Sequence, residues 1–240
     1  MSTNDEAKRL AQAGDGGNLI VWAKSQSGGR GRRGRQWTSP EGNLYCSFLL
    51  RPNCTIAEAP QIGFVAVLAV ADVVMSHLGG AKPVQVKWPN DVLVDGRKVA
   101  GILLESQTRL DDMLDWLVVG QGVNLISHPG ETLFPATNLR AEGAIEGQGI
   151  EADLALLGGR FAHWFDIWIA SGFSALRDAW LARAYGLGRE ISLREPAVPS
   201  NGQFVDLDLD GAMVLEQPDG QRCRVTTGDV QVMDQEMGEP

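Results

Sequence analysis

Hydrophobic residues recur along this chain with two spacings, one helical and one typical of strands. Residues 61–78 are apolar on nearly every face, which predicts a long buried helix that begins after Pro60. Its uninterrupted apolar stretch is shorter than the ~20 residues of a membrane span. Three further segments also have helical character, and short apolar runs bounded by turn residues predict strands. The predicted helices are 7–13, 152–170 and 173–184, and the predicted strands are 19–23, 43–50, 84–88, 92–94, 99–106 and 115–125.

Turn and capping residues separate these elements. Ser2, Thr3 and Asn4 precede two acidic residues, which is the pattern of a capped helix start. Asp95-Gly96, between two predicted strands, indicates a hairpin. Residues 127–149 are rich in Gly, Pro and polar residues and predict a loop, and the polar tail 234–240 is expected to fray.

The pattern changes near residue 187. From there short strands alternate with turn residues at 201–202, 210–211, 219–220 and 227–229, which predicts a small all-β barrel. We therefore expect two domains, a catalytic one over residues 1–186 and a barrel with its tail over 187–240.

Composition narrows the classes of function. The formal net charge is −9 and the sequence pI about 4.8, which argues against a general nucleic-acid or membrane-surface binder. Three scattered cysteines form neither a disulfide framework nor a zinc pattern, so a reducing, cytoplasmic compartment is expected. The N-terminus has no apolar segment typical of a signal peptide.

Against this acidic background, residues 29–35 read Gly-Arg-Gly-Arg-Arg-Gly-Arg, and Trp37 follows. Glycine permits close backbone approach, arginine offers donors that fit carboxylate and phosphate, and tryptophan presents a flat aromatic face. The segment predicts a loop that closes over an anionic ligand with a ring, such as a nucleotide. The alternative is a basic linker or RNA-binding tract, which the position between two strands disfavours.

Three further motifs carry candidate chemistry, and each has a plain structural alternative. Residues 87–91, Lys-Trp-Pro-Asn-Asp, end a strand and suit a phosphate with its Mg²⁺, or simply form a turn. Lys98 opens an apolar strand and either stabilises a transferring phosphoryl group or reaches solvent. Residues 120–124, Gly-Gln-Gly-Val-Asn, indicate close approach by a ligand or a β-bulge.

In this order, the motifs resemble those of the biotin–protein ligases. That family carries a Ser/Thr-Thr-Asn segment, Gln-x-x-Gly-Arg-Gly-Arg-x-Gly-Arg-x-Trp, Lys-Trp-Pro-Asn-Asp, Lys-x-Ala-Gly-Ile-Leu-x-Glu and Gly-x-Gly-x-Asn. The matching segments here are 2–4, 26–37, 87–91, 98–105 and 120–124. The resemblance covers essentially the whole chain, including a C-terminal Gly228-Asp229. It implies an α+β fold, with a mixed sheet flanked by helices as in class II aminoacyl-tRNA synthetases and a C-terminal SH3-like β-barrel.

The resemblance implies a biotin–[acetyl-CoA-carboxylase] ligase. Such an enzyme uses ATP and Mg²⁺ to form biotinyl-5′-AMP and then transfers biotin to a lysine of the biotin carboxyl carrier protein. Because the chain begins essentially at Ser2, we expect a form without the N-terminal DNA-binding domain that some members carry. The oligomeric state stays open between monomer and homodimer. The alternatives are a lipoate–protein ligase or octanoyltransferase of the same fold and a nucleic-acid-binding module.

The resemblance also assigns residues. Lys98, Arg32, Arg30 and Lys87 are the implied catalytic residues, and Asp91 is the implied metal ligand. The implied biotin contacts are Ser2, Thr3, Asn4, Gln26, Arg30, Gly31, Arg32, Lys98, Gly101, Leu103, Gly120 and Gly122. The implied nucleotide contacts are Arg32, Arg35, Trp37, Lys87, Asn90 and Asn124. Contacts from residues 127–149, whose sequence matches the family only loosely at 136–139, are left open.

Overall fold

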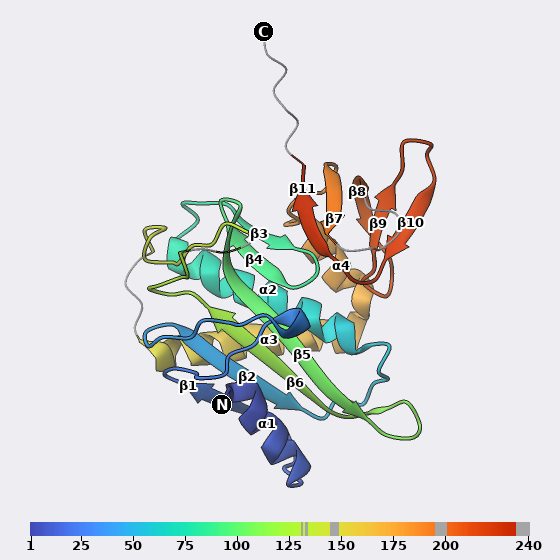
Figure 1. Cartoon of the computed structure of the whole chain (residues 1–240). Helices are drawn as coiled ribbons and strands as arrows, with labels where there is room; N and C mark the ends of the chain where they lie inside the picture. Colours follow the sequence, from blue (N-terminus) through green and yellow to red (C-terminus); the bar gives the residue numbers. More distant parts are fainter. Residues whose placement is uncertain (131, 133, 145–148, 195–200, 234–240) are drawn as a thin grey trace.

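The computed structural model describes residues 1–130, 132, 134–144, 149–194 and 201–233. Its centre is a six-stranded sheet in the order β1-β2-β6-β5-β4-β3, whose neighbouring strands are all antiparallel (Figure 1). Parallel pairing is present as isolated bridges, such as Lys98 with Ala136. The strands are β1 (Leu19–Ala23), β2 (Leu44–Leu50), β3 (Val84–Lys87), β4 (Asp91–Val94), β5 (Arg97–Thr108) and β6 (Leu114–Val123).

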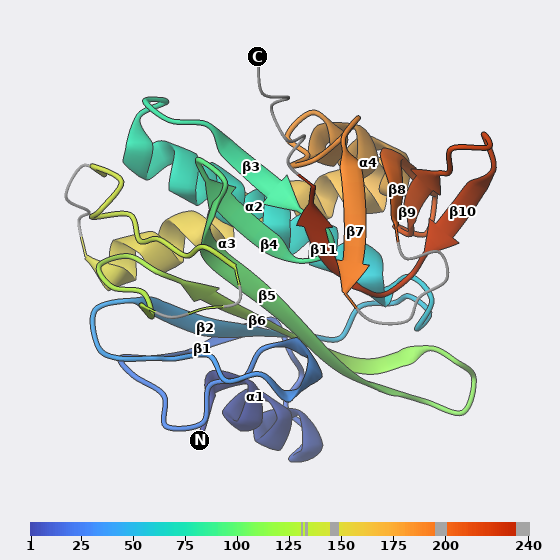
Figure 2. The ribbon, with the colours of Figure 1, turned by 45° about the horizontal axis from the view of Figure 1, so that its top comes forward.

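Helices cover the two faces of this sheet. On one face lies α1 (Thr3–Gln12), which begins with a capping box formed by Ser2 and Asp5. On the other lie α2 (Ala59–Leu78) and α3 (Ile150–Ser171), with α4 (Phe173–Leu181) at one end (Figures 1 and 2). Two separate sets of buried hydrophobic side chains result, a small one under α1 and a large one around α2.

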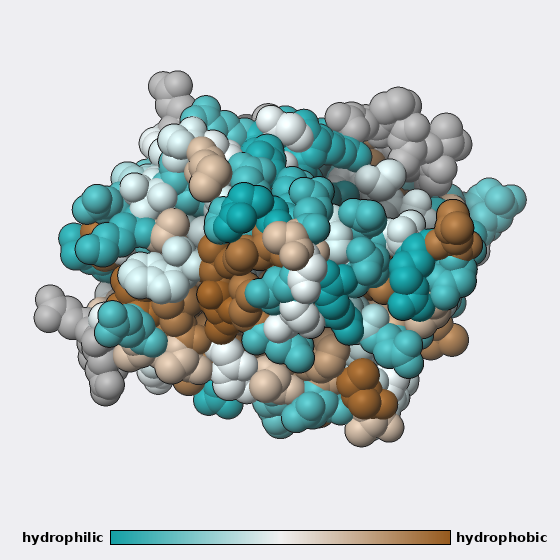
Figure 3. Space-filling model, turned by 90° about the horizontal axis from the view of Figure 1, so that it is seen from below, coloured by the Kyte–Doolittle hydropathy of each residue, from teal (hydrophilic) through white to brown (hydrophobic). Residues whose placement is uncertain are grey.

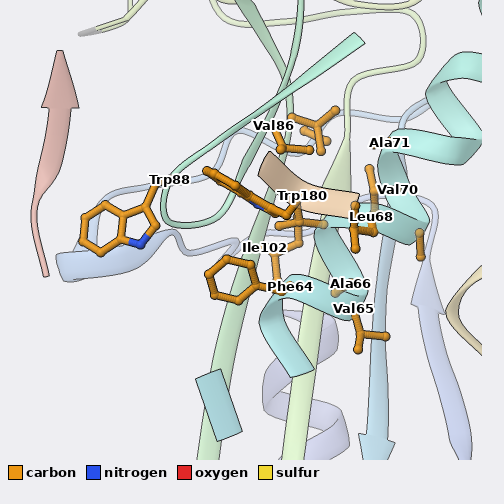
Figure 4. Packing of buried hydrophobic residues seen from close by; sticks show 14 of the residues in the cluster. Phe64, Val65, Ala66, Leu68, Val70, Ala71, Val86, Trp88, Ile102 and Trp180 are labelled. Atoms are coloured by element: carbon orange, nitrogen blue, oxygen red, sulfur yellow. The ribbon is translucent and has the colours of Figure 1, made fainter. Parts of the chain in front are cut away.

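The apolar character of α2 follows from its position. In the described part of the chain it is the one helix long and apolar enough to span a membrane, and it is mostly buried between the sheet, α3 and α4. Its one charged interior residue, Asp72, accepts hydrogen bonds from Trp164 Nε1 and Arg183 Nη1 at 2.8 and 2.7 Å. Figure 4 shows Phe64 of α2 beside Trp180 of α4, whose ring centroids lie 5.7 Å apart.

The C-terminal strands form a second, antiparallel sheet in the order β10-β9-β8-β7-β11. It packs against the first unit, since Trp180 meets Phe204 edge-on and Trp88 Nε1 donates to Gly211 O at 3.0 Å. Figure 3 shows the whole molecule from below the view of Figure 1, and on that face hydrophobic residues gather near the centre, surrounded by hydrophilic residues. The strands are β7 (Glu190–Arg194), β8 (Asn201–Leu207), β9 (Met213–Glu216), β10 (Arg222–Val225) and β11 (Asp229–Val232).

The predicted elements are confirmed with shifts of a few residues at their ends. The described part of 127–149 contains no helix or strand, as expected, and Asp95 and Gly96 both take left-handed φ angles in the hairpin turn. One predicted turn is wrong, because Asn201 and Gly202 lie inside β8 and pair with β7. Close packing favours glycine there, since a Cβ would lie 3.0 Å from the backbone oxygen of Glu216. The tail 234–240 lies outside the described residues.

Candidate active site

One cavity of about 290 Å³ opens on the α1 face of the sheet, and every residue predicted for the site lines it. These residues come from α1, the β1–β2 loop, β3, β4, β5 and β6, so elements distant in sequence converge on one place. The sequence had not assigned the other lining residues. They are Gln36, Thr38, Trp88, Pro89, Ile102, Gln121, Pro129, Thr132, Phe134, Ala136, Asp229 and Val230.

The floor of the cavity is made by glycines on neighbouring strands. Gly101 of β5 pairs with Gly122 of β6, two residues beyond Gly120. A Cβ at Gly122 would lie 2.5 Å from Trp37 Nε1, and one at Gly120 would lie 2.8 Å from Asn4 Cγ. Side chains therefore rest directly on the backbone of β6, and no other residue type leaves that space.

At one end of the floor, the start of α1 presents a network of polar groups that ends at the Glu105 carboxylate. Thr3 N donates to Gln26 Oε1 at 2.8 Å. Ser47 Oγ lies 2.7 Å from Thr3 Oγ1 and 2.5 Å from Asn4 Oδ1, while Asn4 Nδ2 donates to Glu105 Oε2 at 2.7 Å. Since Thr3, Asn4 and Ser47 are buried and hydrogen-bonded within this network, their orientations are fixed. This end suits a small polar head group with both donors and acceptors.

The arginine loop runs over the cavity between β1 and β2. Arg30 Nη2 donates to Asp5 Oδ1 at 2.6 Å, which ties the loop to α1. Arg32 reaches Asn90 Oδ1 at 3.4 Å, and Arg33 and Arg35 donate to Asp229 of the C-terminal sheet. The loop is therefore fastened at α1, at the end of β3 and at β11.

Two lysines stand at the other end of the floor. Lys98 Nζ lies 2.6 Å from Asp91 Oδ1 and 5.3 Å from the centroid of the Trp37 ring. Lys87 Nζ lies 3.7 Å above the Phe134 ring, and burial lowers the pKa of Lys87 to about 8. Positive charge held away from water favours an anion such as a phosphate at this end.

Two of the predicted nucleotide contacts, Trp37 and Asn124, differ in their surroundings. Trp37 Nε1 is buried against Gly122 and has no hydrogen-bond partner among the described residues, so Trp37 offers a ligand its ring rather than this donor. Asn124 Nδ2, in contrast, donates to Thr137 O at 3.0 Å, which fastens the 135–139 segment beside the cavity. Asn124 thus has a structural contact besides lining the cavity.

Among the residues that sequence reasoning missed, Phe134 and Asp229 contact side chains of predicted site residues directly. Phe134 is an isolated aromatic residue in a loop of Thr and Pro, which is the signal that could have identified it. Asp229 belonged to the Gly-Asp of the family resemblance but received no role. Burial opposes ionisation of Asp229, yet Arg35, Arg33 and Arg32 together lower its pKa.

Comparisons with known proteins agree with this arrangement. The family model described as "Biotin/lipoate A/B protein ligase family" matches residues 2–124, and that described as "Biotin protein ligase C terminal domain" matches 186–233. The biotin–[acetyl-CoA-carboxylase] ligase of Paracoccus denitrificans is 40% identical over 230 residues, covering 92% of this chain and 93% of that protein. The bifunctional ligase/repressor BirA of Bacillus subtilis is 31% identical over 91% of this chain and 68% of that protein.

A solved structure extends the likeness to three dimensions. The biotin protein ligase from Aquifex aeolicus in complex with biotin and ATP superposes with a TM-score of 0.79 at 27% identity. The superposition covers 97% of this chain and 94% of that one. The predicted α+β class, with a sheet flanked by helices and a C-terminal β domain, is thereby confirmed. By its matched domains, its relatives and its fold, the chain belongs to the biotin/lipoate A/B protein ligase family and, within it, to the biotin protein ligases.

Proposed function

We propose that this chain activates biotin with ATP as biotinyl-5′-AMP and transfers it to a lysine of a biotin carboxyl carrier protein. One observation carries the proposal. A single cavity joins a polar head-group end at α1 to the cationic end at Lys87 and Lys98, with the arginine loop above. Biotin has a polar ureido head and a carboxylate at the end of its chain, so it fits this polarity in one direction only.

In the first step, a biotin carboxylate oxygen attacks the α-phosphorus of ATP. The new O–P bond forms while the bond to the β-phosphate breaks, and pyrophosphate leaves with its electron pair. The attacking carboxylate and the triphosphate repel each other, so cations must hold them together. Lys98 and Arg32 serve this purpose in our proposal, with Lys87 on the phosphates and Trp37 against the adenine.

In the second step, the amine of the carrier lysine attacks the acyl carbon of the adenylate. An amide forms, AMP leaves with the electron pair of the acyl–oxygen bond, and the amine loses its proton. Water would compete in this step, so the adenylate needs a cover. The arginine loop, fastened by Arg30 to Asp5 and by Arg35 to Asp229, supplies that cover.

Mg²⁺ belongs to the proposal as the companion of ATP. The described residues contain no group of three or more His, Cys, Asp or Glu arranged to hold a metal ion. Asp91, whose Oδ1 is buried beside Lys98, offers one carboxylate at the cationic end. One carboxylate together with substrate phosphates is the usual environment of Mg²⁺, so the donor set fits. There Mg²⁺ would neutralise charge on the phosphate oxygens.

The partner and the compartment complete the proposal. We infer that the acceptor is the biotin carboxyl carrier subunit of acetyl-CoA carboxylase and that the reaction takes place in the cytoplasm. The edge strand β1 exposes Ile20 and Trp22 by 41% and 40%, and such an edge suits a second copy of the chain or the carrier.

The deciding experiment incubates the protein with biotin, MgATP and a biotin-carrier domain and measures the mass of the carrier. We expect an increase by one biotinyl group that requires both biotin and ATP. The same carrier with its acceptor lysine replaced by arginine is the control and should stay unmodified. Calorimetry with biotin and with lipoate distinguishes the two ligase activities. A heat of binding for lipoate and none for biotin would overturn the proposal.

A further inference from the structure

Glu105 lies near the end of β5, and the two-step reaction proposed above gives it no role. Its carboxylate nevertheless meets three nitrogen atoms around the head-group end of the cavity. Oε2 accepts from Asn4 Nδ2 at 2.7 Å, Oε1 accepts from Lys8 Nζ at 2.7 Å, and Arg30 Nη2 lies 3.6 Å from Oε2. Burial opposes its ionisation, but Lys8, Asn4 and Arg30 together lower the pKa of Glu105. The group is therefore an anion at neutral pH.

An ionised carboxylate accepts hydrogen bonds and donates none. The Asn4 amide must therefore turn its NH₂ towards Glu105, which directs its carbonyl oxygen the other way. There Oδ1 accepts from Ser47 Oγ at 2.5 Å and lies over Gly120 on the cavity floor. The charge of Glu105 thus decides which end of the Asn4 amide the cavity receives.

We infer that Glu105 is a positioning residue that sets Asn4 as a hydrogen-bond acceptor for the head group of the substrate. The inference rests on the proposed function, because a ureido head group presents N–H donors on its two sides. An acceptor at Asn4 matches such a donor, whereas a reversed amide would set donor against donor and leave both unpaired. Through Arg30, the same carboxylate links the head-group end to the arginine loop.

The test exchanges the two partners. In Glu105→Gln the new amide can donate to Asn4, so the Asn4 amide is no longer forced into one orientation. The double variant Asn4→Asp/Glu105→Gln reverses the pair, with the amide at position 105 as donor and a carboxylate at position 4. That variant again places an acceptor over Gly120. Lys8→Met is the matched control, since it removes a cation from Glu105 without touching the amide.

We measure the KM for biotin and the kcat of biotin-dependent pyrophosphate release for each variant. Glu105→Gln should raise the biotin KM about 10-fold or more, the range expected for a charged hydrogen bond, with a smaller change in kcat. The double variant should recover most of the loss, and Lys8→Met should stay near the wild type.

The inference is overturned if Glu105→Gln leaves the biotin KM unchanged, or if the double variant binds biotin no better than Glu105→Gln. It is equally overturned if Lys8→Met causes the same loss. If Glu105→Gln does not fold, a melting curve shows it, and recovery by the double variant still decides. A wild-type protein that fails to biotinylate the carrier refutes the proposed function instead, so the two failures are distinguishable.

Discussion

Gly120 and Gly122 lie two residues apart in β6, yet each faces a different end of the cavity. A methyl group at position 120 would meet Asn4 at the head-group end, and one at position 122 would meet Trp37 at the nucleotide end. Neither glycine has a left-handed φ, so an alanine adds contact without backbone strain. Gly120→Ala should therefore impair biotin binding selectively, and Gly122→Ala should impair use of ATP.

The size of each effect follows from the overlap. The added Cβ would lie 2.8 Å from Asn4 Cγ at position 120 and 2.6 Å from Trp37 Cε2 at position 122. Ordinary carbon contacts begin at about 3.5 Å, so Trp37 must move by roughly 0.9 Å, and Asn4, whose Oδ1 overlaps the added Cβ more closely than its Cγ does, by more than about 0.7 Å. Asn4 cannot move without losing its bonds to Ser47 and Glu105. Overpacking of this kind costs about 1–3 kcal/mol, or about 5- to 150-fold in a dissociation constant.

Calorimetry with biotin and the ATP dependence of pyrophosphate release separate the two effects. Gly120→Ala should raise the Kd for biotin with a smaller change in the KM for ATP, and Gly122→Ala should do the reverse. Gly159→Ala, which adds a methyl group on α3 in open space, is the control and should change neither value. Equal losses for both substrates in both variants, with normal melting curves, would refute the assignment of the two ends.

Four further predictions concern single side chains. Lys98→Ala should nearly abolish biotin-dependent pyrophosphate release while the circular dichroism spectrum stays native, and undiminished release would remove Lys98 from the mechanism. Arg32→Gly should loosen the cover and release more biotinyl-5′-AMP into solution than the wild type, as measured by chromatography of the filtrate. Because burial lowers the pKa of Lys87 to about 8, its ammonium is present below that pH and lost above it. The KM for ATP should therefore be flat below about pH 8 and rise by about one decade per pH unit well above it; Lys87→Met should lack this inflection. Both side-chain amide atoms of Gln121 are buried without a hydrogen-bond partner among the described residues, so Gln121→Leu should raise the free energy of unfolding by about 1–3 kcal/mol in urea titration.

The periodic elements and the local motifs were predictable, because their signals lie within a few residues. The apolar run of α2, the hairpin at Asp95-Gly96 and the loop that carries the arginines need only local sequence. The resemblance to a family then supplied the site residues, and all of them line one cavity. That they share a cavity supports their predicted roles, which remain to be tested by the variants above.

The contacts that orient the site were not predictable from local patterns, since their partners lie far apart in the chain. Glu105 meets Asn4 across 101 positions, and Asp229 meets Arg35 across 194. The turn predicted at Asn201-Gly202 failed for a related reason, because pairing with β7 outweighs the local preference of Asn-Gly for a turn. Such contacts depend on the register of whole strands, which short motifs do not encode.

Contacts with the C-terminal sheet make the four arginines of the loop unequal in what they contribute to phosphate binding. Arg33 and Arg35 already donate to the Asp229 carboxylate, so a phosphate that binds them replaces one anionic acceptor with another and gains only the difference. The contacts of Arg32 with Asn90 and Thr227 are to neutral oxygens at 3.4 Å, and burial with the neighbouring Arg33 lowers its pKa. The free energy gained when a phosphate binds is therefore larger at Arg32 than at Arg35, although both lie in the same loop. This difference is why removal of Arg32 should weaken the hold on the phosphate of the adenylate more than removal of Arg35.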